Sequence, residues 1–219
     1  MTTFPGSPKT ARGALIGLDL VNPLASVIVF QYNPDEVTRT VTANASSEGG
    51  SPGEQLRLKG PPSESISFTV EVDAVDQLER GDALTVSLGL TPVLASFELL
   101  LYPKSPVVIA NSLLAAAGLV EVVPMEAPLA VLVWGPQRVL PVRLNSFTIT
   151  EEAFDPGLNP IRAKVGLDLK VLTYEDLGLA SAGGALFLAH QITKEAMATI
   201  NSAASLGDFS ASASLGIGG

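Results

Sequence analysis

The chain has 219 residues, a formal net charge of −9, one histidine and no cysteine. Without cysteine it has no disulfide, thiolate chemistry or Cys-based zinc site, and its acidic balance repels phosphate, which argues against a nucleic-acid partner. Hydrophobic residues make up 47% and charged residues only 16%, against roughly a quarter charged in ordinary soluble domains; surface covered by other subunits and a simple richness in alanine, leucine and valine both explain this balance.

The first part of the chain is predicted to be an arm followed by short strands. Residues 1–24 are assigned to an N-terminal arm, since Pro5, Gly6 and Pro8 deny its beginning a regular structure. No apolar stretch follows a basic one there, so we expect no signal peptide and a cytoplasmic protein. Strands are predicted at residues 25–32, 37–41 and 65–73, with a loop at 44–53 and a period-two segment at 55–59. The strand at 65–73 alternates cleanly and points Ile66, Phe68, Val70 and Val72 to the core.

Helices are predicted in the middle of the chain, after an ambiguous stretch at 75–89. Thr91 as N-cap and Pro92 as first helical residue open one helix, which Pro103 closes. A second is expected at 106–119. The apolar run at 107–123 overlaps it but is shorter than the roughly 20 residues that a membrane span needs, so we expect no direct membrane span.

A long antiparallel hairpin is the clearest feature of the second half. Strands are predicted at 129–134, 139–150 and 161–171, and Pro141 indicates an edge or a bulge. The turn formers at 155–160 join the last two strands. After them come a small-residue linker at 177–184, a helix at 186–201 whose apolar stripe contains Leu188, Ile192, Ala196 and Thr199, and a mobile Ser/Ala/Gly-rich tail.

These elements predict a mainly β fold without βαβ alternation. We expect an antiparallel β-sandwich or barrel with one or two packed helices and a C-terminal helical extension. The domain boundaries are residues 1–24 for the arm, 25–177 for the β domain, and 178–219 for the linker, amphipathic helix and flexible tail.

Residues that carry chemistry are scarce. His190 stands alone, so a catalytic triad or a His-based metal site has no second partner in the sequence. The segment 13–17 lacks the Lys-Ser/Thr of a phosphate loop, and the neighbours Glu151 and Glu152 point to opposite faces of a strand. We therefore predict no enzyme, no catalytic or metal residues and no cofactor.

Three stretches together resemble a known family. They are FQYNPDEVTRT at 30–40, ELLLYP at 98–103, and the run from LVWGPQ to TYEDL at 132–177. They resemble the tube-domain family of contractile injection systems, which includes the LysM-bearing baseplate proteins that join the inner tube to the spike hub. This chain departs from those relatives after Leu177, where no LysM module has room.

The resemblance implies a phage tail-tube type of fold and a structural role. The chain would form a ring, as a hexamer, that connects the inner tube to the baseplate spike hub and initiates the tube. Its partners would be copies of itself, the inner tube protein, the spike or hub protein and other baseplate subunits, in an assembled cytoplasmic particle. We expect the C-terminal helix to dock on a neighbouring ring or the hub, with packing on its own domain as the alternative. Candidate interface residues are Phe30, Tyr32, Asn33, Trp134, Phe154, Leu188, Ile192 and Ala196.

Two other functions stay open. A cap or terminator subunit of the same machine would differ mainly in position. A soluble β-barrel ligand-binding module or enzyme would instead show a single concave pocket with converging polar groups. Trp134 illustrates the ambiguity, because a core or rim position and an interface anchor both suit a tryptophan at a strand end.

Overall fold

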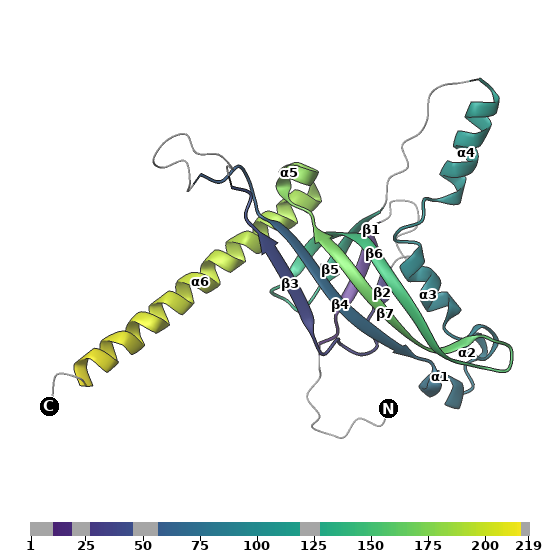
Figure 1. The fold of residues 1–219 in the computed structure, drawn as a ribbon, viewed down its shortest axis with the longest axis horizontal. Helices are drawn as coiled ribbons and strands as arrows, with labels where there is room; N and C mark the ends of the chain where they lie inside the picture. The colour runs from purple at the N-terminus through teal and green to yellow at the C-terminus, as the bar shows by residue number, and fades with distance from the viewer. Residues whose placement is uncertain (1–10, 19–26, 46–56, 119–127, 216–219) are drawn as a thin grey trace.

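One antiparallel sheet organises the chain (Figure 1). The computed structural model describes residues 11–18, 27–45, 57–118 and 128–215, with side-chain surroundings up to residue 206. Within these residues the sheet has seven strands in the order β2-β1-β5-β6-β7-β4-β3. The strands are β1 (Ala14–Leu18), β2 (Val27–Val29), β3 (Val37–Thr42), β4 (Ser63–Asp73), β5 (Leu129–Val133), β6 (Val139–Phe154) and β7 (Pro160–Val171). The helices are α1 (Val75–Glu79), α2 (Ala83–Leu88), α3 (Thr91–Glu98), α4 (Ser105–Ala116), α5 (Tyr174–Leu177) and α6 (Ala182–Leu215).

The predicted hairpin is the centre of the sheet. β7 pairs with β6 on one side and with β4 on the other. The strict alternation of β7 places Ala163, Val165, Leu167, Leu169 and Val171 in the core, as predicted. In the turn the carboxylate of Asp155 accepts hydrogen bonds from the backbone and side-chain nitrogens of Asn159, each at 2.8 Å. This local bonding holds Leu158 at a φ of 64° and closes the turn tightly.

The sheet curls so that its two ends face each other. Phe30 follows the edge strand β2 and Phe68 lies on β4, yet their rings meet with centroids 5.6 Å apart although β1, β5, β6 and β7 lie between these strands. Trp134, directly after β5, packs on both rings at 6.3 and 5.8 Å. The side chain of Gln31 also accepts a hydrogen bond from the backbone nitrogen of Asp73 at 2.9 Å. Side-chain contacts therefore connect the β2 end of the sheet to β4 across a seam where the two strands do not pair through their backbones.

The mainly β fold with packed helices is confirmed, and the sheet stays open. Among the described residues β2 and β3 are its two edges, so the strands do not close into a hydrogen-bonded barrel. Helix α3 covers the core with the buried side chains of Leu94 and Phe97. Leu90 occupies the N-cap position, so the prediction of Thr91 as the cap was off by one residue.

Several predictions for the first part of the chain were wrong. The segment assigned to an arm contains β1, which lies between β2 and β5 and buries Leu15 completely. Its short apolar run cannot be told from other buried segments by periodicity. The strand expected at 25–32 is reduced to β2, residues 25 and 26 lying outside the described part. The segment at 55–59 shows only the bridge between Ala45 and Leu58, with 55 and 56 likewise outside it.

Pro141 lies in an interior strand, so the edge, one of the two positions predicted for it beside a bulge, is wrong. It faces Val131 of β5 and is fully buried, and its carbonyl accepts a hydrogen bond from the backbone nitrogen of Leu172 at 2.9 Å. The paired register of β6 with β7 begins only at Val142, so the missing N–H of Pro141 interrupts no ladder bond there.

The predicted linker and tail are largely helical. Thr173 and Asp176 form a capping box that starts α5, and α6 begins at Ala182 and continues to Leu215. Gly183 and Gly184 are buried in its first turn, and a Cβ on Gly184 would overlap the carbonyl oxygen of Gly178. These glycines allow close packing, so they do not form the flexible linker that the sequence predicts.

The orientation of β7 can be tested with one charge. Leu167→Asp should lower the free energy of unfolding by several kcal/mol, because it buries an unpaired carboxylate. Thr150→Asp places the same group on the exposed face of β6 opposite Lys164 and should change stability by about 0.5 kcal/mol or less. Urea unfolding of both variants checks this, and equal tolerance would contradict the inward orientation of Leu167.

Candidate interaction surfaces

A buried carboxylate joins the edge of the sheet to the C-terminal helix. The Glu64 side chain is 4% exposed at the start of β4. Its Oε1 accepts a hydrogen bond from Nε of Arg39 on β3 at 2.8 Å, and its Oε2 from Nζ of Lys194 on α6 at 3.2 Å. A buried charge is tolerated only when it is paired, so Glu64 requires both cations in place.

The pKa of Glu64 reflects this pairing. Burial by itself would raise that pKa, but the hydrogen bond from Arg39 and the charges of Lys194 and Arg39 outweigh burial and hold it below 4.5. The carboxylate therefore stays ionised at neutral pH and keeps the first part of α6 fixed against the sheet. Sequence reasoning missed this site, although Glu64 continues the core-facing parity of Ile66 and Phe68 on β4.

The first half of α6 packs on the β domain through one helix face. Phe187 is 6% exposed and meets the ring of Tyr174 on α5 with centroids 5.7 Å apart. His190, one turn further, is 8% exposed, and neither ring nitrogen makes a hydrogen bond within the part of the chain described. Burial and the charge of Lys194 lower the pKa of His190 below 6.5, more than the backbone of Gln137 and the carboxylate of Glu64 raise it. The docked helix therefore prefers a neutral imidazole.

The second half of α6 leaves the domain. Every residue from 195 to 206 is exposed, and Figure 1 shows the helix continuing well beyond the sheet. Exposed apolar side chains along this part are Met197, Ile200 and Leu206, and Ile192 precedes them by less than two turns. Because these residues are exposed, the segment receives no packing support from its own domain. Isolated helices shorter than about 12–15 residues are only marginally stable in water.

The stripe predicted on this helix faces away from its own domain. Ile192 is 56% exposed, Ala196 and Thr199 are exposed, and Leu188 is half-buried. Residues of the opposite face, Phe187, His190 and Lys194, make the contact with the sheet instead. The helix thus packs on its own domain, the alternative weighed above, while the predicted docking stripe remains uncovered.

Helix α4 is a second projecting element. It has no buried residue and no charged side chain between Ser105 and Ala116. Val108, Ile109 and Leu113 are 42%, 59% and 67% exposed. In Figure 1 the helix stands apart from the sheet, at the end opposite to the distal part of α6. An apolar helix is normally buried, so α4 presents a surface suited to a partner.

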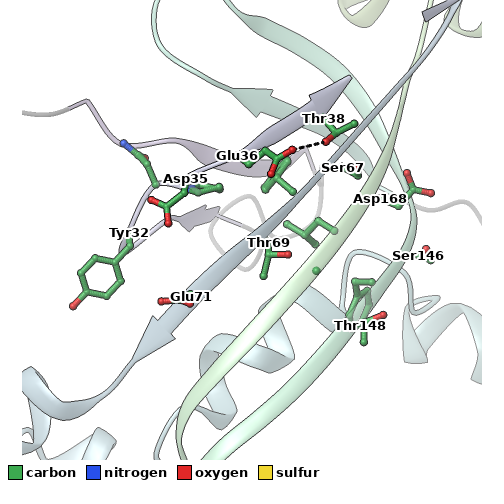
Figure 2. Close-up of a pocket in the computed structure, with 16 residues that line it drawn as sticks. Tyr32, Asp35, Glu36, Thr38, Ser67, Thr69, Glu71, Ser146, Thr148 and Asp168 are labelled. Atoms are coloured by element: carbon green, nitrogen blue, oxygen red, sulfur yellow. Dashed lines mark hydrogen bonds between the residues drawn. The ribbon is translucent and has the colours of Figure 1, made fainter. Parts of the chain in front are cut away.

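The outer face of the sheet is polar and concave. A groove of about 740 Å³ runs across β3, β4, β7 and β6 (Figure 2). Hydroxyl groups of Thr38, Ser67, Thr69, Ser146 and Thr148 line it, together with the carboxylates of Asp35, Glu36, Glu71 and Asp168. The hydroxyl of Thr38 and the carboxylate of Glu36 form a long hydrogen bond of 3.5 Å. The groove is wide and acidic, unlike an enclosed ligand pocket.

The predicted interface residues fall into different places. Phe30 is 1% exposed and is a core residue, so its side chain has no surface to offer a partner, and Trp134 is half-buried beside it. Tyr32 and Asn33 are exposed together at the rim of the polar groove, as Figure 2 shows for Tyr32. Phe154, 48% exposed, lies apart at the end of β6.

The described residues show no grouping of three or more His, Asp or Glu side chains that could hold a metal ion. Of the helices in the described ranges, none combines the length and apolarity needed to cross a membrane.

Comparison with known proteins finds only weak structural similarity. No family model and no curated protein matches the chain. Among solved structures it is similar to a chain of the virion of a native gene transfer agent particle, with 14% identity over 73% of this chain and 90% of that one and a TM-score of 0.29. A chain from the tail of an empty gene transfer agent particle with C6 symmetry gives 14% identity, the same coverage and a TM-score of 0.30. Scores this low do not establish a common fold.

Protonation of His190 should loosen α6. Below the ordinary pKa of 6.5 the released imidazole gains a proton while the docked one resists it, so docking weakens as the pH falls. We expect amide exchange in residues 182–194, corrected for intrinsic rates, to accelerate between pH 7 and about 5. His190→Phe should remove most of this dependence, since pairing with Arg39 and Lys194 holds the pKa of Glu64 below its ordinary value and that carboxylate contributes little between pH 7 and about 5. The same pH profile in both proteins would exclude His190 as the cause.

Proposed function

We propose that the chain is a non-enzymatic structural subunit of a phage-tail-like contractile injection system. The observation that carries the proposal is a pair of apolar projections, α4 and the distal half of α6, that the chain's own core leaves uncovered. Surfaces of this kind are normally buried against partners. They also account for part of the chain's 47% hydrophobic residues, because the apolar side chains of these two helices lie outside the core.

The edges of the sheet support the proposal of a ring. β2 and β3 each pair on one side only within the described residues, and β3 is exposed along nearly its whole length. Unpaired edges add strands from another chain unless they are blocked. Head-to-tail pairing of β3 with β2 of a neighbouring copy would use both edges and close a ring, as a hexamer. The polar groove would then face a water-filled lumen.

The position in the particle is proposed from the two projections. α4 and the distal part of α6 extend from opposite ends of the sheet (Figure 1), so they suit two different neighbours. We assign these neighbours to the inner tube protein and the spike or hub protein, with other baseplate subunits around the ring. In this role the ring connects tube to hub and initiates the tube, in a particle assembled in the cytoplasm. A cap or terminator would need only one such projection.

A ligand-binding module fits the molecule less well. Pockets for small molecules usually enclose roughly 300–1,000 Å³ of mostly apolar space. The 740 Å³ groove is an open sheet face where hydroxyls and carboxylates lie beside Tyr32 and Phe147, and the hollow beside α3 measures only about 250 Å³.

Purified protein should assemble. Light scattering at micromolar concentration is expected to give a mass several times the 22.6 kDa of one chain, consistent with a ring or a polymer. Thr40→Pro in β3 removes an N–H and should reduce the mass, whereas Thr69→Ala on the groove face should not. A monodisperse species of one chain mass, together with normal particles from cells that lack the protein, would contradict the proposal.

Truncation separates folding from docking. Removal of residues 195–219 should leave the thermal midpoint nearly unchanged, because residues 195–206 are exposed, but should yield particles with a weakened joint between tube and baseplate. Removal from residue 184 onward takes away Phe187 and Lys194 and leaves Glu64 with Arg39 alone, so it should destabilise the domain. Particles that assemble and fire normally with the shorter truncation would exclude a docking role for the distal helix.

A further inference from the structure

A hollow lies at the open seam of the curled sheet. It encloses about 250 Å³ between β2, β4 and α3. Its walls include five core residues, Ile28, Phe30, Val70, Val72 and Phe97. Val93 of α3 also lines it and is 37% exposed, and Gln31 is one of its few polar members. The hollow therefore connects the surface to the hydrophobic core and favours an apolar side chain as its occupant.

Both strands beside the hollow have an unpaired backbone edge there. Within the described residues β2 pairs only with β1, and β4 has no partner on its β3 side beyond Phe68 although it continues beside β7 to Asp73. The backbone nitrogen of Asp73 points to this open side, where the side chain of Gln31 accepts its hydrogen bond at 2.9 Å. Alternate residues of a strand direct their backbone groups to the same side, so Thr69 and Glu71 do likewise. An extended strand is therefore the kind of occupant that these groups can bind.

Of the described strands other than β2 itself, β3 is the one with a whole edge left to offer. Its side opposite to β4 is unpaired, and it is exposed along nearly its whole length. Each neighbouring pair in the sheet is antiparallel, so β2 and β3, the first and last of the seven strands, run in the same direction. In a head-to-tail arrangement of copies, β3 of one copy would lie parallel to β2 of the next.

One side chain of β3 suits the hollow. Val37, Arg39 and Val41 lie on the core-facing side of β3, because their cross-strand partners on β4 face the core. Val37 already packs against the core and Arg39 binds Glu64, whereas Val41 is 54% exposed. The hollow lies beside residues 28–31, at the end of β2. Parallel pairing brings the end of β3, where Val41 lies, to this region.

We propose that Val41 of a neighbouring copy fills the hollow beside β2, with β3 of that copy completing the seam. The inference rests on the head-to-tail ring proposed above and adds the side chain that fixes its contact. The hollow is incomplete in a single chain, and Val41, uncovered in its own chain, becomes buried in the next. Because side chains alternate along a strand, Thr40 and Thr42 point to the polar outer face in the same pairing.

Crosslinking between copies tests this orientation, because the chain has no cysteine of its own. Two full-length proteins, one with Val93→Cys and one with Val41→Cys, are mixed under assembling conditions and treated with a short thiol crosslinker. A size tag on one of them identifies the mixed dimer. Its yield should be several-fold higher than with Thr40→Cys in place of Val41→Cys, since Thr40 is the adjacent exposed residue of the same strand. Equal yields from the two pairs would overturn the proposal.

Assembly of two polar variants gives an independent readout. Val41→Asn places an amide in the hollow, whereas Thr40→Asn places the same group on the polar outer face. Both residues are exposed in the single chain, so both variants should keep the circular dichroism spectrum of the unchanged protein. By light scattering, Val41→Asn should need a several-fold higher protein concentration to assemble, and Thr40→Asn should assemble as the unchanged protein does. The same concentration dependence for both variants would contradict burial of Val41.

The outcomes separate this contact from the ring itself. An assembly of several chain masses without a preference for Val41 over Thr40 would refute the contact and leave the ring standing. A protein that stays a single chain and gives no mixed dimer would count against the contact and the ring together.

Discussion

The rest of the structure depends on the pairing of β7 with β4 and β6 in one register. Every second residue of β7 is apolar, and the register aligns these residues with the core-facing sides of both neighbours. The sheet therefore has one continuous hydrophobic face, which a few short helices cannot cover. Curling buries that face against itself, and the meeting of Phe30 with Phe68 is the result. The same curl stops short of closure, and so leaves two unpaired edges and an apolar seam in the part of the chain that the structure describes.

The contacts that complete the core also aim the projecting helix. Glu64 lies at the core-facing side of β4, where an acid is stable only beside Arg39 and Lys194. Because Lys194 belongs to α6, this ion-pair requirement sets the direction in which the helix leaves the sheet. The distal stripe then points away from the domain by geometric necessity, since Phe187 and His190 occupy the opposite helix face. The same ion pairs therefore stabilise the fold and set the orientation of the projecting part of α6.

The surfaces resolve an ambiguity of the composition. A low fraction of charged residues could reflect alanine, leucine and valine placed in a large core. In the described chain much apolar surface instead lies outside the core, on α4 and the distal half of α6, where Ile109, Leu113, Ile200 and Leu206 are all more than half exposed. Four carboxylates, those of Asp35, Glu36, Glu71 and Asp168, lie on the polar groove, where their like charges oppose self-association of that face. The molecule therefore carries its acidic groove and its exposed apolar helices on different surfaces.

The sequence by itself determined the elements whose pattern is local. Alternation in β4 and β7 and the turn formers at 155–160 predicted these strands and their inward faces correctly, because a period of two is visible within one strand. The prediction failed where contact with another element determines the local structure. β1 is a strand because β2 and β5 pair with it, and Gly183 and Gly184 are helical because close packing needs them. Phe30 is a core residue because the sheet curls onto it. The interaction of Glu64 with Lys194 spans 130 positions, a distance at which only tertiary structure brings opposite charges together.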